Sequence, residues 1–268
     1  MRKTFTTPGP LLLDLRLPAG EIDLESADGV ETEVVLEPLD PGNDRAQEAV
    51  DRARVELRER RDGQTVVVDV GSRLGSLLGG APSLRLAIRA PHGSDIEART
   101  SSADLEGRGR FGATEVETAS GGVRFEEVGQ GRVNTASADV RFGRIGGEAA
   151  VNSASGDVAI DVLEGPGKIR SASGDVVVGE AGSDLTVQTA SGDQSVGSIG
   201  KGDVRLQSAS GDIRVGVRKG SKLWVDAKSM SGETSSELEV GDTLPEGEGP
   251  LVELRATAMS GDIRIVRA

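Results

Sequence analysis

The chain has no cysteine and no tyrosine, and it contains only one histidine and one tryptophan. The absence of cysteine excludes disulfide bonds, thiolate metal sites and cysteine nucleophiles. His92 alone is too little for a histidine metal cluster, and we also expect no Ser-His-Asp triad around it. It stands between Pro91 and Gly93, as a residue of a surface turn does. With so few aromatic rings, stacking against sugars has little support either.

Positive charge and long apolar runs are also scarce. Acidic residues number 44 against 31 basic ones, and the resulting net charge of −13 disfavours nucleic acids and anionic membranes as partners. No segment approaches the ~18 apolar residues of a membrane span. The N-terminal leucines alternate with polar residues, which is typical of a strand and not of a secretory signal. We therefore expect a cytoplasmic protein that does not insert into membranes; an extracellular location would need an export route that the sequence does not show.

What the sequence has in abundance is a repeat. The phrase Thr/Ser-Ala-Ser-Gly-Asp returns about every 18 residues. Its second hydroxyl residue falls at Ser102, Ser120, Ser137, Ser155, Ser173, Ser191 and Ser210, and after wider gaps at Ser231 and Ser260. A period of this length is one coil of a stack, because a single coil cannot bury its apolar side without neighbours. We predict an all-β fold, a flattened single-stranded β-solenoid (β-helix-like) with about 18 residues per coil.

Aligned coils give columns of residues that alternate as strands do. The inward apolar column is Val116, Val133, Val151, Ile169, Val187 and Leu206. Two positions later stand hydroxyl residues of the same parity, namely Thr118, Thr135, Ser153, Ser171, Thr189 and Ser208. We expect these hydroxyls to point inward and to hydrogen-bond from coil to coil. The same alternation predicts that Ser173 lies inside, whereas the alanines beside it and Arg214 face outward.

Residues 1–100 lack the clean repeat, and we predict that they form an N-terminal capping region before the solenoid repeats of residues 101–268. Within that region, Gly20 to Leu36 has the pattern of a degenerate coil with a turn at residues 26–29.

One helix and one loop are expected in the capping region. Asn43 or Asp44 can cap a helix at about residues 44–57, where apolar residues follow helical spacing. Glycine and small residues dominate residues 71–82, which we predict to be a Gly-rich loop.

The aspartates of the repeat form the sharpest candidate site. They are Asp104, Asp139, Asp157, Asp175, Asp193, Asp212 and Asp262. A row of carboxylates at the ~5 Å strand spacing has the ligand type that calcium prefers. The structural alternative is that each aspartate caps its own turn by accepting backbone N–H bonds beside a glycine with positive φ. We favour this structural turn column, because each coil supplies only one ligand, and we expect no metal, no cofactor and no catalytic residue.

The Thr/Ser-Ala-Ser-Gly-Asp-Val coils resemble a bacterial β-strand-repeat family of unknown function, labelled "putative adhesin" and also described as the toastrack domain of envelope-stress systems. The likeness is closest to actinobacterial members. The matching parts are Phe5 to Pro8, Asp44 to Leu57, Gly71 to Pro82, the coils from Ser102 onward, and the closing Leu251 to Ala256 with its last Gly-Asp turn. This resemblance implies a β-solenoid without an established activity.

Two functions remain open at this point. The first is a non-enzymatic scaffold that binds a protein partner through its outer face or its Gly-rich loop, with a link to envelope stress. The second is an adhesin that binds carbohydrate or a cell-surface ligand. Enzymatic activity ranks third, since regularly repeated Ser-Gly-Asp turns are what a structure demands and not what a unique active site shows.

Overall fold

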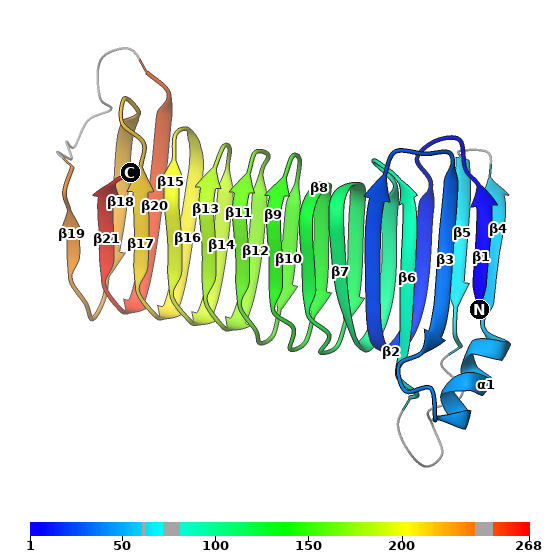
Figure 1. Ribbon diagram of the computed structural model, residues 1–268. Helices are drawn as coiled ribbons and strands as arrows, with labels where there is room; N and C mark the ends of the chain where they lie inside the picture. The colour runs from blue at the N-terminus through cyan, green and yellow to red at the C-terminus, as the bar shows by residue number, and fades with distance from the viewer. Residues whose placement is uncertain (61–62, 72–80, 239–248) are drawn as a thin grey trace. The chain divides into compact units, whose positions relative to one another are not determined.

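The computed structural model describes residues 1–60, 63–71, 81–238 and 249–268. It forms two compact units, Met1–Asp139 and Val140–Ala268. Both consist almost entirely of β-strands, as Figure 1 shows, and the all-β prediction is confirmed. The predicted change from capping region to repeats at residue 100 stays a prediction.

The first unit contains one helix and eight strands among its described residues. They are β1 (Arg2–Thr6), β2 (Leu12–Ala27), β3 (Glu31–Pro38), α1 (Asp44–Arg52), β4 (Arg54–Arg60), β5 (Gly63–Asp69), β6 (Leu84–Pro91), β7 (Asp95–Thr118) and β8 (Val123–Thr135). Long β2 lies between β7 on one side and β5 and β6 on the other, and all of these pairs are parallel. Antiparallel strands complete the unit: β4 pairs with β5, and β3 lies between β6 and β1.

Two N-terminal predictions are corrected here. Glu31–Pro38 is not the second half of a coil, because β3 runs antiparallel to β6. The helix ends at Arg52 and not near residue 57, since Ala53 is extended and the chain continues as β4. Its start was predicted correctly, for the Asn43 side chain accepts a hydrogen bond from the Ala46 N–H at 3.1 Å. Most of the predicted Gly-rich loop, residues 72–80, lies outside the described residues.

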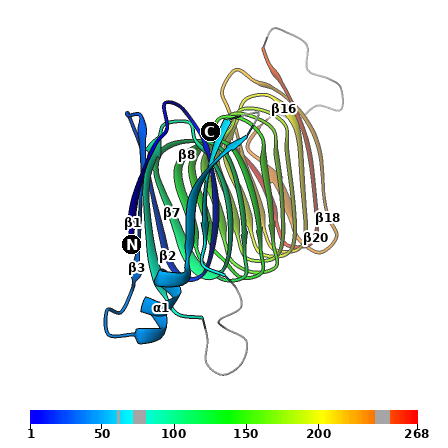
Figure 2. The ribbon, with the colours of Figure 1, turned by 90° about the vertical axis from the view of Figure 1, so that its right-hand side faces the viewer.

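The second unit is a stack of parallel strands in two sheets, seen with its strands upright and side by side in Figure 1 and along the stack in Figure 2. Its strands are β9 (Val140–Ile145), β10 (Ala149–Ser153), β11 (Val158–Leu163), β12 (Gly167–Ser173), β13 (Val176–Ala181), β14 (Leu185–Ser191), β15 (Gln194–Ile199), β16 (Gly202–Ser210), β17 (Ile213–Val217), β18 (Lys222–Ser229), β19 (Thr234–Ser236), β20 (Leu251–Ser260) and β21 (Ile263–Arg267). Neighbouring coils pair in register, with Val151 beside Ile169 and Ile169 beside Val187. The predicted inward column is fully buried in both units, at 1% exposure or less.

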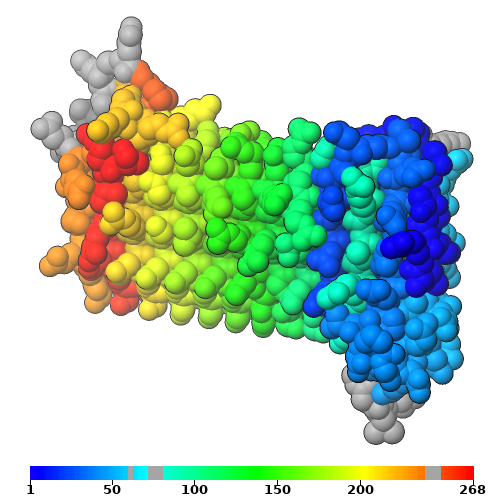
Figure 3. All heavy atoms as spheres, viewed as in Figure 1, coloured from blue at the N-terminus to red at the C-terminus, as the bar shows by residue number. Residues whose placement is uncertain are grey.

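The last coils of this stack do not follow the order of the sequence. β20 pairs with β16 on one side and with β18 on the other, and β21 likewise lies between β17 and β19. The coil of β20 and β21 therefore lies between the coil of β16 and β17 and the coil of β18 and β19. As a result, β18 and β19 form the end coil of the unit (orange in Figures 1 and 3).

Candidate functional site

The predicted aspartates lie at the turn between the two strands of each coil, where they make a ladder from coil to coil. In the second unit, Oδ1 of Asp157, Asp175, Asp193 and Asp212 accepts a hydrogen bond from the backbone N–H of the aspartate in the next coil, each at 2.8 Å. Asp262 continues the ladder to the N–H of Glu233 at 3.0 Å. In the first unit, Oδ1 of Asp104 accepts from the N–H of Gly122 at 2.8 Å.

Each aspartate is held by its backbone as well. The carbonyl oxygen of Asp175 accepts the N–H of Val158 at 2.9 Å, and that of Asp139 accepts the N–H of Val123 at the same distance. We expected the carboxylate to accept an N–H group of its own turn, and this is wrong, because the donor belongs to the next coil. The carboxylate binds the next coil because the turns stack directly on one another.

The hydroxyl column takes the role that the aspartates were expected to have. Oγ1 of Thr118 accepts the N–H of Gly121 at 3.0 Å, and the hydroxyl of Ser171 donates to the carbonyl of Ser173 at 2.9 Å. Both side chains are 7% exposed, so the inward direction is correct. A hydrogen bond from coil to coil is formed within this column by Thr189, whose hydroxyl donates to Oγ of Ser208 at 3.2 Å. The hydroxyls thus close their own turns while the carboxylates join the coils.

Ser173 itself is exposed, which corrects the prediction that it lies inside. It stands at the end of β12, where the chain turns and strand alternation stops applying. Glycine makes this turn possible: Gly174 has φ of +115°, and a Cβ built on it would lie 2.3 Å from the carbonyl oxygen of Gly156 in the adjacent coil.

No three histidine, aspartate or glutamate side chains in the described part of the chain are grouped so that they could hold a metal ion. In the ladder, one carboxylate oxygen of each bonded aspartate is already engaged by an N–H group.

A constellation that the sequence reasoning missed lies in the first unit. Nδ1 of His92 and Oγ of Ser26 are 2.9 Å apart, and Nε2 of His92 is 3.7 Å from Oδ1 of Asp28. The parts of a Ser-His-Asp triad are therefore close together, contrary to expectation. Ser26 is only 7% exposed and its Oγ also accepts the N–H of Arg110 at 2.6 Å, whereas the Asp28 side chain is fully exposed. A buried serine that fixes the turn of β7 explains this geometry better than a nucleophile does.

Three arginines line a hollow of the first unit. A cavity of about 640 Å³ is lined by Arg16, Arg54 and Arg99 together with Leu17, Pro18, Asp69, Gly71, Thr100 and Ser101. Arg16 comes from β2, Arg99 from β7 and Arg54 from the start of β4, so three strands that are distant in sequence supply the guanidinium groups. Gly71, where the Gly-rich segment begins, lies at the same hollow, and its N–H donates to Asp69 at 2.8 Å.

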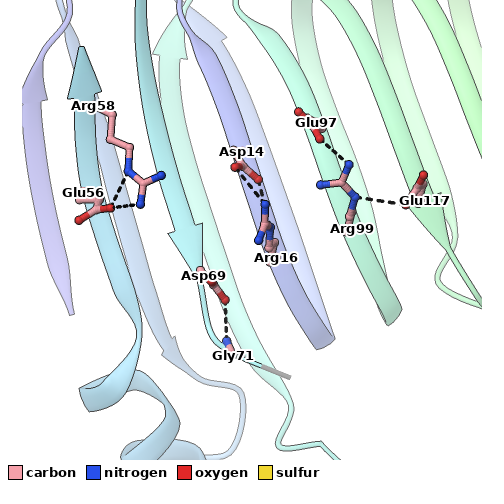
Figure 4. A network of polar contacts seen from close by, with 9 residues as sticks. All are labelled: Asp14, Arg16, Glu56, Arg58, Asp69, Gly71, Glu97, Arg99 and Glu117. Carbon is pink, nitrogen blue, oxygen red and sulfur yellow. Dashed lines mark hydrogen bonds and ion pairs between the residues drawn. The ribbon is translucent and has the colours of Figure 1, made fainter. Parts of the chain in front are cut away.

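Two of the three arginines at the hollow, Arg16 and Arg99, form ion pairs (Figure 4). Arg99 lies between Glu97, at 2.6 Å, and Glu117, at 3.2 Å, and Arg16 is 3.4 Å from Asp14. The nearby charge of Glu97 raises the pKa of Arg99 further above its usual value, so this group stays cationic. Arg54 is exposed and makes no ion pair with any described residue.

The fold defines the class of the protein, an all-β solenoid of parallel coils. Its sequence then gives the family: residues 21–266 match the family "Toastrack DUF4097", and the chain belongs to it. The predicted resemblance is confirmed. No curated protein matches the chain.

Several solved structures are similar to this chain at low sequence identity. A "putative adhesin" from Parabacteroides distasonis ATCC 8503 is 11% identical, with a TM-score of 0.44 over 98% of this chain and 96% of that one. Another "putative adhesin", from Parabacteroides merdae ATCC 43184, is also 11% identical, with a TM-score of 0.42 over 100% and 96%. A "putative lipid binding protein" from P. distasonis is 9% identical, with a TM-score of 0.37 over 100% and 96%. Similarity at this level transfers no ligand to this chain.

No helix in the described ranges is long and apolar enough to cross a membrane.

Proposed function

We propose that this chain is a non-enzymatic β-solenoid scaffold that binds a protein partner, and that an acidic segment of the partner docks at the hollow of Arg16, Arg54 and Arg99. The observation that carries the proposal is this concentration of three exposed guanidinium groups on a chain of net charge −13. Arginine forms paired hydrogen bonds with carboxylates. Arg54 stands opposite Asp69 in the pairing of β4 with β5 but forms no ion pair with a described residue, so its guanidinium group is available to a partner.

A scaffold fits the rest of the molecule better than an enzyme does. The hydroxyl and carboxylate groups of the repeat form hydrogen bonds within the turns and between the coils, as Ser171, Asp157 and Asp175 show. The one Ser-His-Asp constellation keeps its serine buried and bonded to a backbone N–H. Regular, exposed coil faces are what solenoid proteins use to bind other proteins.

The alternative function is that of an adhesin for carbohydrate or a cell-surface ligand. Sugar-binding sites use the open face of an aromatic ring. In this chain the guanidinium carbon of Arg255 lies 5.0 Å from the ring centre of Trp224, so one face of the single tryptophan is already covered. This contact favours the scaffold.

The test is affinity capture from the native host, with soluble and membrane fractions kept apart and the captured proteins identified by mass spectrometry. The bait is the wild-type chain or the double variant Arg54→Glu with Arg99→Glu. Arg170→Glu is the matched control, because Arg170 is an exposed arginine on β12 of the second unit that bonds only Gln188. We expect a partner that the control retains and the double variant loses.

Recovery of that partner from the membrane fraction would support the link to envelope stress. A partner that binds the double variant as well as the wild type would contradict the arginine site. Binding to glycans on an array, with no protein captured, would favour the adhesin.

A further inference from the structure

The end coil of the second unit leaves one strand edge open. β18 pairs with β20, and within the described residues no strand pairs with its other edge. Its inward side chains are only half-buried at Leu223, Val225 and Ala227, whereas the residues beside them on β20 are fully buried. An open edge with apolar side chains is a template for a further strand.

The other strand of this coil does not continue the apolar column. Thr234 and Ser236 of β19 stand beside Ile263 and Ile265, so hydroxyl groups replace aliphatic side chains at the inward positions. Association at this end of the unit therefore depends on β18.

The edge strand β4 of the first unit separates its apolar residues with charged ones. β4 alternates Arg54, Glu56 and Arg58 along the segment, and Arg58 is paired with Glu56. β18 by contrast has three consecutive apolar residues, Leu223 to Val225, between Lys222 and Asp226. This run of apolar residues is longer than any on β4, and on an open edge it favours pairing with a further strand.

We propose that β18 pairs antiparallel with β18 of a second copy of this chain, in the register centred on Trp224. A two-fold axis makes the same strand serve both sides of such an interface. In this register Lys222 of each copy faces Asp226 of the other. Asp226 already lies 2.9 Å from Lys228 of its own strand, so Lys222 of the second copy adds a second cation to each carboxylate. On the inner face, Leu223 lies opposite Val225, so the two half-covered apolar columns complete each other.

The neighbouring registers are unfavourable. Centring the pair on Val225 sets Lys222 against Lys228, and centring it on Asp226 sets two carboxylates against each other. A shift by a single residue in the pairing would place the inward side chains of one copy beside the outward side chains of the other. Charge and side-chain direction therefore select the same register.

Trp224 is the centre of this interface. It points to the outer face of the sheet, and Arg255 holds its ring while bonding Asp203 at 3.0 Å and Glu253 at 3.2 Å. Two copies of this tryptophan would lie side by side with an arginine over each. One strand pair buries little area, so the dimer is of the weak, reversible kind.

The experiment measures dimerisation of the full chain by sedimentation velocity over a wide range of concentrations. Since the chain has one tryptophan, its fluorescence reports the same interface directly. Lys222→Asp alone and Asp226→Lys alone each place like charges opposite one another, and we expect roughly tenfold weaker dimerisation for each. The double variant, Lys222→Asp with Asp226→Lys, restores opposite charges and should recover the dimer.

Lys168→Asp, an exposed lysine on the inner strand β12, is the matched control and should dimerise as the wild type does. A wild-type chain that stays monomeric would overturn the proposal. So would a dimer that both single variants leave unchanged, or one that the double variant fails to restore. Hydrogen exchange of the β18 amides gives one more test. If these amides are protected when host proteins are added but not when the chain is concentrated by itself, the edge binds a different partner and self-pairing is wrong.

Discussion

In the ladder, Asp175 bonds both neighbouring coils through its side chain and its backbone. Asp175 accepts the N–H of Asp193 with its carboxylate, donates its own N–H to Asp157, and receives the N–H of Val158 at its carbonyl. A residue with three bonds between coils fixes their register as well as their spacing.

Asp175→Ala removes one of these bonds and leaves the N–H of Asp193 without its acceptor. We expect the free energy of unfolding to fall by roughly 1 kcal/mol. Asp175→Asn keeps an Oδ1 acceptor and should lose less. Asp161→Ala is the control, because Asp161 is an exposed aspartate with only a 3.4 Å ion pair to Arg141. Urea unfolding followed by circular dichroism gives the comparison, and equal losses for Asp175→Ala and Asp161→Ala would refute a stabilising ladder.

The ladder also predicts a dependence on pH. The N–H bond from Glu233, together with Arg264, lowers the pKa of Asp262 below its ordinary value. A carboxyl whose pKa is lower in the folded state stabilises the fold above the unfolded pKa, about 3.9, and loses that effect as the pH falls toward the folded pKa. The side chain of Asp262→Asn does not titrate. The difference in the free energy of unfolding between the wild type and this variant should therefore narrow below about pH 4. Urea unfolding at a series of pH values measures this difference, and a constant difference would rule the mechanism out.

Ser171 and Ser173 give a matched pair for the hydroxyl column. Ser171 is 7% exposed and closes its turn, whereas Ser173, two residues on, is exposed. Ser171→Leu overfills the core and should lower the free energy of unfolding by about 1–3 kcal/mol. Ser173→Leu should change it by less than about 0.5 kcal/mol. Thermal unfolding of the two variants decides between them, and equal melting temperatures would mean that this register is misplaced.

At the scale of elements, local signals were readable from the sequence and long-range ones were not. The Asn43 cap and the inward valines follow from neighbours a few residues away, and both were predicted. The end of α1 was missed because Val55 and Leu57 suit a strand as well as a helix, and only the pairing of β4 with β5 decides. Ser26 and His92 are 66 residues apart in the sequence, and no local pattern predicts their contact.

The helix makes an element-scale prediction. α1 buries Ala46, Ala49 and Val50 and packs against β3. Replacing residues 44–52 with a Gly-Ser linker should uncover apolar surface and cause soluble aggregation, which light scattering detects. Gln47→Ala, which removes only a surface contact with Asp51, is the control and should stay dispersed. A dispersed linker variant would show that the helix protects nothing.

At the scale of the whole molecule, the period of the repeat predicted the stack, but the order of its last coils could not be predicted. The coils that end in Ser-Gly-Glu233 and Ser-Gly-Asp262 carry the same pattern, and either would fit beside β16 in register. Likewise, Arg16, Arg54 and Arg99 lie on separate strands, and only the pairing of β2 with β5 and β7, together with that of β4 with β5, brings their segments together.

Removing the C-terminal residues from 249 onward should therefore do more than shorten the stack. β18 and β19 pair with β20 and β21, so the truncated chain would leave them without their partners. We expect the amides of β18 to exchange hydrogen rapidly in the truncated chain and slowly in the full one. Slow exchange in both would mean that β18 can dock directly on β16.

The inserted coil also sets the timing of folding in the cell. Residues 251–267 leave the ribosome after β18 and β19, yet they fill an inner layer of the second unit, beside β16 and β17. Coils up to β17 can stack during translation, but β18 and β19 lack their partner strands until residues 251–267 have been synthesised. During that interval the chain carries two unpaired strands, and synthesis of this inner coil is what allows them to pair.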